Sequence, residues 1–294
     1  MTAKTEKFPR KRLPDWLKTP LPKNKNFFQL KALVEKHNLN TVCESASCPN
    51  IGTCWDAGTL TFMILGDSCS RACRFCDVET GNLMAPDPNE PQNIANTLSK
   101  LNLRYAVITS VDRDDLKDGG AEHWVKTIRH VRSKCPQMKI ETLIPDFQGD
   151  LQLVEKICDA KPDVLAHNLE TVESLQSKIR PQCRYSWSLD TLRTAAKKDQ
   201  LIVKSSLMLG VGEKEEEVIC SMKDLVDSGC QILSLGQYLR PSPRHLEVVE
   251  FIHPDRFLKY KEIGEALGLS HVESGPLVRS SYLADQQARS AGLV

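Results

Sequence analysis

Long apolar runs are absent from this 294-residue sequence. None approaches the ~18 to 20 residues that a membrane-spanning helix needs, and the N-terminus lacks the apolar core of a secretory signal. An excess of charge of one sign is also absent, because 39 Lys and Arg balance 38 Asp and Glu. No overall field therefore draws the chain to nucleic acid or to an anionic membrane. We expect a cytoplasmic, monomeric protein with neither as its partner.

Regular structure is not expected in residues 1–25, where eight Lys and Arg are interspersed with four prolines. We interpret this stretch as an extended, solvated arm that is anchored through Trp16 and Leu17. An organellar transit peptide is the alternative, but the stretch is poor in serine and contains Glu6 and Asp15.

Disulfides are not expected either. The cysteine count of 11 is odd, the chain is long, and six of the cysteines fall between Cys43 and Cys76. Cysteines clustered in this way usually bind metal in a reducing compartment. The other five are isolated on or beside apolar segments, and we expect them in the core: Cys135, Cys158, Cys183, Cys220 and Cys230.

One cysteine triplet directly follows the apolar run 61–66, with Cys69, Cys73 and Cys76 spaced C-x3-C-x2-C. Three thiolates on one short loop can hold three irons of a cubane cluster, which leaves the fourth iron open to an exogenous ligand. A zinc knuckle is the alternative, but it needs four closing ligands, usually in C-x2-C pairs. The spacing therefore favours an iron–sulfur cluster with one open iron.

An earlier triplet, Cys43, Cys48 and Cys54, follows a short amphipathic helix expected over 26–37. The residues between these cysteines are polar or turn-forming, and no period places all three on one buried face. Three core cysteines are therefore a poor explanation. Two triplets within 34 residues indicate two clusters.

Apolar and amphipathic segments alternate from residue 61 onward. The apolar segments are rich in Val, Ile and Leu, as in parallel strands buried on both faces. This alternation predicts a parallel sheet, doubly wound or curled toward a barrel, and the missing G-x-G-x-x-G disfavours a dinucleotide-binding fold. We predict strands over 61–66, 105–110, 139–144, 164–168, 201–210 and 231–236, and helices over 93–101, 122–134, 151–160, 172–178, 189–198, 215–228 and 255–267.

Polar residues gather where the predicted strands end. In parallel βα folds these ends face one cavity, so residues far apart in sequence can share a site. Asp112, Asp114 and Asp115 can instead cap a turn, and His167 is expected to be a satisfied core histidine. The candidate ligand-binding residues are Asp112, Asn168, Glu170, Gly210, Gly212 and Gln237.

The C-terminal stretch contains Arg279-Ser280-Ser281-Tyr282. Together with the two triplets it resembles the lipoyl synthases, a family of the radical S-adenosylmethionine (SAM) superfamily, from about Trp16 to the terminal helix. The resemblance implies an α/β fold, a partial (β/α)6 TIM-type barrel with an N-terminal extension that carries an auxiliary iron–sulfur cluster. The expected parts are an arm and auxiliary-cluster loop (1–58), the radical SAM barrel (59–268) and a C-terminal segment with the Arg-Ser-Ser-Tyr motif (269–294).

Two [4Fe-4S] clusters and SAM are the cofactors that the resemblance implies. The later triplet would hold the SAM cluster, and the candidate residues at the strand ends would contact SAM. The earlier triplet would hold the auxiliary cluster with a serine as the fourth ligand, and we favour Ser281 over Ser280. The implied ligands are Cys69, Cys73 and Cys76 for the SAM cluster, and Cys43, Cys48, Cys54 and Ser281 for the auxiliary cluster.

The implied reaction inserts two sulfur atoms, at C6 and C8 of an octanoyl chain on a lysine of a carrier domain. An unactivated C–H bond offers neither acidity nor a leaving group, so a radical must break it. No residue is therefore expected to act as an acid or base. A 5′-deoxyadenosyl radical from SAM would abstract hydrogen, and the auxiliary cluster would donate sulfur.

The implied partners are octanoylated carriers, namely the glycine-cleavage H protein and 2-oxoacid dehydrogenase E2 subunits. An electron donor such as ferredoxin or flavodoxin and a cluster-repair carrier are implied too. Two other functions remain open: a biotin-synthase-like sulfur-inserting enzyme, and a non-catalytic binding protein stabilised by metal. Iron and sulfide content would separate the binding protein from both enzymes.

Overall fold

The computed structural model describes residues 12–19, 25–36, 40–57, 59–101 and 103–292. Seven parallel strands form one sheet in which the strands neighbour one another in chain order. The parallel α/β sheet that the sequence predicts is confirmed. Its strands are β1 (Thr61–Ile64), β4 (Tyr105–Ser110), β5 (Lys139–Leu143), β6 (Val164–Ala166), β7 (Ile202–Leu209), β8 (Ile232–Gln237) and β9 (His271–Gly275).

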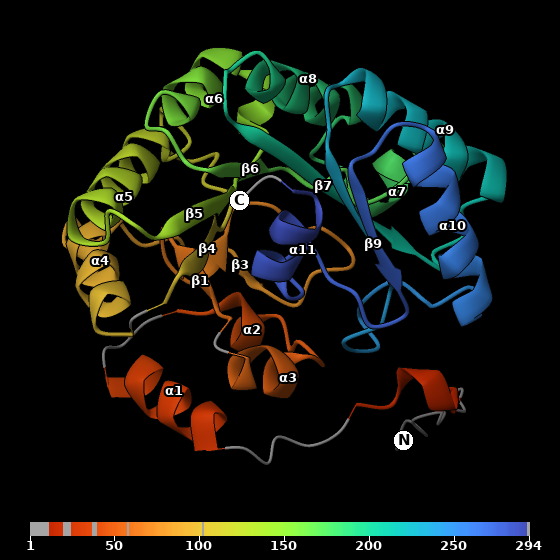
Figure 1. Cartoon of the computed structure of the whole chain (residues 1–294), viewed down its shortest axis with the longest axis horizontal. Coiled ribbons are helices and arrows are strands. Elements are labelled where there is room, and N and C mark those ends of the chain that lie inside the picture. The colour runs from red at the N-terminus through yellow and green to blue at the C-terminus, as the bar shows by residue number, and fades with distance from the viewer. Residues whose placement is uncertain (1–11, 20–24, 37–39, 58, 102, 293–294) are drawn as a thin grey trace, which may run out of the picture.

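Helices cover the outer side of this curved sheet (Figure 1). Their apolar faces pack on outward-facing strand residues such as Ala106 and Ile108, which are completely buried. Each crossover joins two neighbouring parallel strands, so the sheet curls into an open barrel with β1 and β9 at its edges. The outer helices are α4 (Glu90–Leu101), α5 (Ala121–Lys134), α6 (Leu151–Cys158), α8 (Tyr185–Ala196), α9 (Glu215–Asp227) and α10 (Pro254–Ala266).

Strand β9 is the seventh strand, which the sequence did not predict. Its residues include His271, Glu273 and Ser274, so no apolar run marks it. Pairing with β8 along its whole length forms the strand instead. The sheet thus continues past residue 268, into the segment expected to follow the barrel.

Between β6 and β7 the helices differ from the prediction. The helix expected over 172–178 is a 3-10 turn, Glu173–Leu175, followed by the single turn of α7 (Gln176–Ile179). Helix α8 begins at Tyr185 rather than 189 because Tyr185 packs inward and donates a hydrogen bond of 2.8 Å to Asp224 on α9.

The inner face of the barrel is partly filled by α11 (Ala284–Ser290), which Figure 1 shows within the arc of strands. Ala284 and Ala288 pack against inward-facing apolar residues of β4, β6, β7 and β8. Beyond helix α11 the inner face of the barrel is polar. Lys204 of β7 forms a buried ion pair of 2.9 Å with Glu141 of β5, which also accepts a hydrogen bond from Tyr105. The C-terminal helix therefore closes one end of the barrel and leaves a polar interior beyond it.

The N-terminal elements line the free edge of β1. Helix α1 (Lys25–Lys36) confirms the predicted amphipathic helix apart from residue 37, which lies outside the described residues, and it packs on α3 (Ile51–Asp56) through Phe27 and Trp55. Thr41, the N-cap of α2 (Val42–Ser45), pairs with Phe62 of β1 in an antiparallel bridge. Two short helices thus replace the loop expected around the earlier triplet.

Part of the predicted arm lies outside the described residues, at 1–11 and 20–24. The anchoring residues are described, and they lie in one 3-10 turn, Asp15–Leu17, where no regular structure was expected. Leu17 is buried, and the Trp16 ring meets His253 edge-on at 5.2 Å. Among the described helices, none is both long and apolar enough to cross a membrane.

Candidate functional site

The loop of the later cysteine triplet begins where β1 ends. A two-stranded ribbon, β2 (Ser68–Cys69) with β3 (Glu79–Thr80), closes its base. The loop also contacts the ends of other strands and helices. Ser70 donates backbone and side-chain hydrogen bonds of 2.9 Å to the Asp112 carbonyl, and Arg74 N–H donates to Ile179. The triplet therefore sits at the carboxyl-end mouth of the barrel, as the sequence predicts.

The buried side chain of Arg71 anchors this loop to the rest of the barrel. Its guanidinium is buried and forms ion pairs with Asp114 at 2.7 Å, Asp146 at 2.7 Å and Asp112 at 3.4 Å. Burial opposes its charge, but these three carboxylates raise the pKa of Arg71 above its ordinary value. One buried cation thus ties the cysteine loop to the ends of β4 and β5.

Backbone amides point at the sulfurs of this triplet. The N–H groups of Arg71 and Asp112 donate to Cys69 Sγ at 3.4 and 3.3 Å, and the N–H of Val78 donates to Cys76. Burial raises the pKa of Cys69 to about 12 and of Cys76 to about 11. Amide donors stabilise thiolates, and a metal would supply the free energy to deprotonate these thiols, so the donor set suits a thiolate-bound cluster.

Asn168 and Glu170 lie at the same mouth, after β6. The Asn168 amide donates to Glu170 at 2.9 Å, while its Oδ1 is buried with no partner. Burial raises the pKa of Glu170. Arg180 is buried nearby, donates to the Leu169 carbonyl at 3.4 Å, and leaves its Nε unpaired. The mouth thus contains a buried acceptor and a buried donor that the described residues leave unsatisfied.

Gly210, Gly212 and Gln237 lie at the ends of β7 and β8. Gly210 has φ +97°, and a Cβ there would strike Gln237 and the Glu250 carbonyl. The Gln237 amide is fully engaged, because it donates to the carbonyls of Leu209, Tyr238 and Glu250 and accepts from Ile252. These residues hold the strap 238–252, which contacts the cysteine loop through a hydrogen bond from Leu246 N–H to the Arg74 carbonyl.

The earlier triplet lines a small cavity of its own. Its other walls come from the start of β1 and from the C-terminal segment. The N–H of Thr61 donates to Cys43 and that of Leu283 to Cys54, and burial raises the pKa of Cys54 to about 12. The lining residues are Cys43, Cys48, Asn50, Ile51, Cys54, Thr59, Thr61, Arg279, Ser281 and Tyr282.

Ser281 faces this cavity, and its neighbour Ser280 is not part of the lining. Thr61 Oγ1 donates to Ser281 Oγ at 2.9 Å and so holds the hydroxyl in place. Arg279 lines the cavity too, and no carboxylate pairs with it among the residues that the structure describes. Three thiols, a hydroxyl and an uncompensated arginine fit a cluster of net negative charge.

The C-terminal segment reaches this cavity through contacts made by small or polar residues. A Cβ at Gly236 of β8 would collide with the Val278 carbonyl, so glycine permits the close approach. Asn50 donates to the Leu277 carbonyl, and Pro276 accepts from Gln237 N–H. The Asn50 contact joins positions 227 residues apart in sequence.

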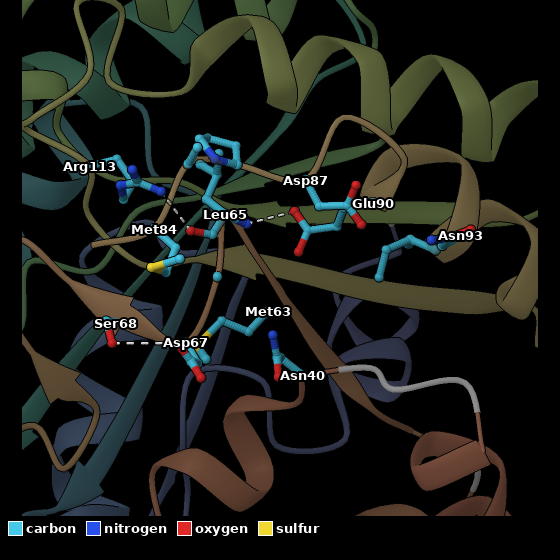
Figure 2. A pocket seen from close by; sticks show the side chains of 14 residues that line it. Asn40, Met63, Leu65, Asp67, Ser68, Met84, Asp87, Glu90, Asn93 and Arg113 are labelled. Carbon is cyan, nitrogen blue, oxygen red and sulfur yellow. Dashed lines mark hydrogen bonds between the residues drawn. The ribbon is translucent and has the colours of Figure 1, made fainter. Parts of the chain in front are cut away.

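A further cavity, of about 240 Å³, lies beside β1 (Figure 2). Met63 and Met84 border it, and Leu65 is held by a hydrogen bond from Arg113 to its carbonyl and by its own N–H donated to Glu90. Its lining takes Met63 from β1 and residues 65–68 from the segment that leads from this strand to the later triplet. That strand is four residues long, about 13 Å.

Arg71 and Arg180 are two functional candidates that the sequence pattern did not single out. Arg71 could have been suspected because it lies between two cysteines of the triplet, whereas Arg180 follows a poorly predicted helix and carried no signal. His167 is confirmed as a core histidine, because its ring bonds the Ile144 carbonyl at 2.8 Å and Ser188 at 2.9 Å. The core placement is wrong for Cys220, which is exposed on α9.

Comparisons with known proteins identify the family of this chain. The chain matches the family model of the radical SAM superfamily over residues 63–225 and that of the N-terminal domain of lipoyl synthase over residues 1–48. It is 50% identical to a lipoyl synthase of Flavobacterium johnsoniae, covering 93% of this chain and 95% of that one. It is 49% identical to a mitochondrial lipoyl synthase of Nematostella vectensis, covering 95% and 96%.

Solved structures agree at the level of the fold. Streptococcus suis SuiB bound to S-adenosylmethionine superposes with a TM-score of 0.54 at 10% identity, covering 82% of this chain and 52% of that one. Coproporphyrinogen III oxidase of Escherichia coli, a radical SAM enzyme, gives 0.51 at 11% identity, covering 69% and 51%. With the identities to whole lipoyl synthases and the two family models, these findings show that the chain belongs to the lipoyl synthase family of the radical SAM superfamily.

Proposed function

We propose that the chain inserts two sulfur atoms at C6 and C8 of a protein-bound octanoyl-lysine, with the auxiliary cluster as the sulfur-donating substrate. The observation that carries the proposal is the cavity where three cysteines from one end of the chain meet Ser281 from the other. A second cysteine triplet at the barrel mouth supports a separate site for radical generation. The family relationship favours this activity over a biotin-synthase-like enzyme and over a metal-stabilised binding protein.

The later triplet would hold a [4Fe-4S] cluster through Cys69, Cys73 and Cys76. When bound, that cluster supplies the electron that cleaves SAM into methionine and a 5′-deoxyadenosyl radical. The chain's own residues hold the loop through Arg71, and backbone amides donate to the sulfurs. The strap 238–252 would cover the mouth, since Leu246 N–H donates to the Arg74 carbonyl of the loop. Excluding water there protects the radical from quenching.

SAM would lie against Asn168, Glu170 and Arg180. SAM ends in an α-amino-carboxylate, which carries both a donor and an acceptor. The unpaired Asn168 Oδ1 and Arg180 Nε are the complementary groups, and a buried polar atom without a partner is costly. Asp112, whose carboxyl lies 3.8 Å from the Cys69 sulfur, would border the same site. Gly212 would allow close backbone approach, whereas Gly210 gives its space to Gln237 and the Glu250 carbonyl, and Gln237 would position the strap.

The auxiliary site would use Cys43, Cys48, Cys54 and Ser281. An alkoxide is harder than a thiolate and a poorer match to iron–sulfur chemistry, so the serine-held iron is the one expected to release first. Arg279 would offset the negative charge of the cluster. Thr61 holds the Ser281 hydroxyl at one end of β1 while the SAM loop leaves from the other end.

The octanoyl chain would pass through the cavity beside β1. This cavity borders the segment between the two triplets at Met63 and at residues 65–68, and Met63 and Met84 offer adaptable apolar contact to an acyl chain. The octanoyl carriers would be the H protein or 2-oxoacid dehydrogenase E2. A ferredoxin or flavodoxin would donate the electron, and a separate protein would repair the auxiliary cluster. The location would be cytoplasmic.

Metal and product analysis tests this proposal. Anaerobically reconstituted protein should contain ~8 iron and ~8 sulfide per chain, the content of two cubane clusters. With dithionite, SAM and an octanoylated lipoyl domain it should yield 5′-deoxyadenosine and lipoyl-lysine. About four iron per chain, or deoxyadenosine without lipoyl product from fully loaded protein, would contradict it.

Hydrogen exchange tests the SAM contacts separately. SAM should slow exchange in the segments around Asp112, Glu170 and Gly212, which are far apart in sequence but meet at one mouth. Protection restricted to residues 69–76 would contradict the shared pocket.

A further inference from the structure

A side-chain hydrogen bond joins the segments that carry the two cysteine triplets. Ser47 Oγ donates to Asp77 Oδ2 at 3.0 Å. Ser47 immediately precedes Cys48 of the earlier triplet. Asp77 immediately follows Cys76 of the later triplet. The bond therefore connects the neighbours of two proposed cluster ligands, one from each cluster.

The backbone of Ser47 adopts an unusual conformation at this contact. Its φ is +50°, in the left-handed region that costs free energy for a residue other than glycine. Its N–H donates to the Glu44 carbonyl at 3.0 Å, and the N–H of Cys48 donates to the carbonyl of Cys43 at 3.0 Å. These bonds hold a turn in which the Ser47 side chain reaches Asp77 while Cys48 lines the auxiliary cavity.

His245 of the strap 238–252 anchors the loop of the later triplet beside Asp77. Its Nε2 lies 2.8 Å from the Cys76 carbonyl and 3.8 Å from Asp77 Oδ1. A carbonyl can only accept, so Nε2 is the donor to Cys76. The other ring nitrogen, Nδ1, lies 2.9 Å from the Ser242 hydroxyl, so the ring is held at both ends. The Asp77 end of the bridge is therefore attached to a fixed part of the mouth.

We propose that Asp77 is a positioning residue that accepts the hydrogen bond from Ser47 and so holds the auxiliary segment (43–54) at one distance from the SAM-cluster loop (69–80). The inference rests on the proposed function, in which one acyl chain must reach both the deoxyadenosyl radical and the sulfur donor. A displacement of about 1 Å between reacting groups is enough to slow a reaction strongly. The bridge therefore affects how often a radical leads to sulfur insertion, rather than how often SAM is cleaved.

Hydrogen exchange of the full, anaerobically reconstituted chain tests the bridge. Asp77→Ala should speed exchange in segment 43–48 about fivefold, the effect of losing one hydrogen bond, although the substitution lies in the other loop. Ser47→Ala should reciprocally speed exchange in segment 74–80, because coupling between two sites acts in both directions. Asp77→Asn keeps an acceptor oxygen and should recover most of the protection.

The matched control is Asp159→Ala. This exposed carboxylate also makes a side-chain bond across the surface, to Lys198 at 2.8 Å, but it lies outside both triplet segments. Its removal should leave exchange in both segments unchanged.

Product analysis measures the consequence for the reaction. In Asp77→Ala the deoxyadenosine formed per lipoyl-lysine should rise several-fold while the rate of SAM cleavage stays close to that of the wild type, because a misplaced acyl chain leaves more radicals without sulfur insertion. Should Asp77→Ala fail to assemble its clusters, Ser47→Ala must show the same rise.

Three results would overturn the inference. Unchanged exchange in segment 43–48 of Asp77→Ala would show that the bond does not hold the auxiliary segment. Equal effects of Asp77→Ala and Asp77→Asn would assign the change to the charge of the carboxylate rather than to the hydrogen bond. Faster exchange with an unchanged product ratio would remove the positioning role. Wild-type protein that forms no lipoyl product would instead contradict the proposed function, and the exchange result would still decide whether the bridge exists.

Discussion

The two cysteine triplets differ most in the charged residues that surround them. At the barrel mouth, Arg71 is surrounded by Asp112, Asp114 and Asp146, so the loop is fixed by ion pairs that are complete without a ligand. At the start of β1, Arg279 has no carboxylate partner among the described residues, and a hydroxyl from the far end of the chain completes the lining. The first arrangement suits a permanent cluster with an open iron. The second suits an anionic cluster that can be taken apart.

The largest effect should come from removing the mouth triplet. Replacing Cys69, Cys73 and Cys76 together with Ala should abolish 5′-deoxyadenosine formation, because no thiolate then holds the SAM cluster. The auxiliary site has separate ligands, so about half of the iron should remain, ~4 per chain. Iron analysis and chromatography of the products check both. Retained deoxyadenosine formation would contradict the division between the sites.

Removing the other triplet should give the converse result. With Cys43, Cys48 and Cys54 replaced by Ala, SAM cleavage should survive and lipoyl product should disappear, since the sulfur source is gone. The measurement is deoxyadenosine and lipoyl-lysine from the same reaction. Loss of both products at unchanged SAM-cluster content would mean that the sites are not functionally separate.

Changing the hydroxyl ligand should have a smaller effect. Ser281→Cys should keep the auxiliary cluster and slow sulfur insertion several-fold, because a thiolate releases iron less readily than an alkoxide. Ser280→Cys is the matched control at the neighbouring position and should leave the rate unchanged. Single-turnover kinetics with SAM and an octanoylated domain measures both rates. If Ser280→Cys is the slow variant, the neighbour has been misassigned.

The smallest effect should be on the pH dependence of stability, through Asp146 at the barrel mouth. Burial raises the pKa of Asp146, but the hydrogen bond and charge of Arg71 outweigh it and hold this pKa below its ordinary value. Its contribution to stability is therefore present above about pH 4 and is lost as pH falls through the lower native value. Asp146→Asn should flatten this part of the pH dependence of urea unfolding. An unchanged pH dependence would show that the ion pair adds nothing.

Much of this arrangement could be predicted from the sequence, because its strongest signals are local. The triplet spacings and the apolar strand segments each lie within a few residues, and they gave the parallel barrel and its mouth. Arg180 and strand β9 could not be predicted, since their roles depend on partners across the fold. Cys183 resembled any isolated core cysteine until folding placed it against Arg71.

The origin of the inserted sulfur tests the account most directly. Protein reconstituted with 34S-sulfide in both clusters should be given unlabelled SAM and an octanoylated lipoyl domain for a single turnover. Mass spectrometry of the lipoyl-lysine should then show two heavy sulfur atoms, with about one product per chain because the sulfides are consumed as reagents. Lipoyl groups containing unlabelled sulfur would contradict the central claim that the Cys43, Cys48, Cys54 and Ser281 site supplies the sulfur.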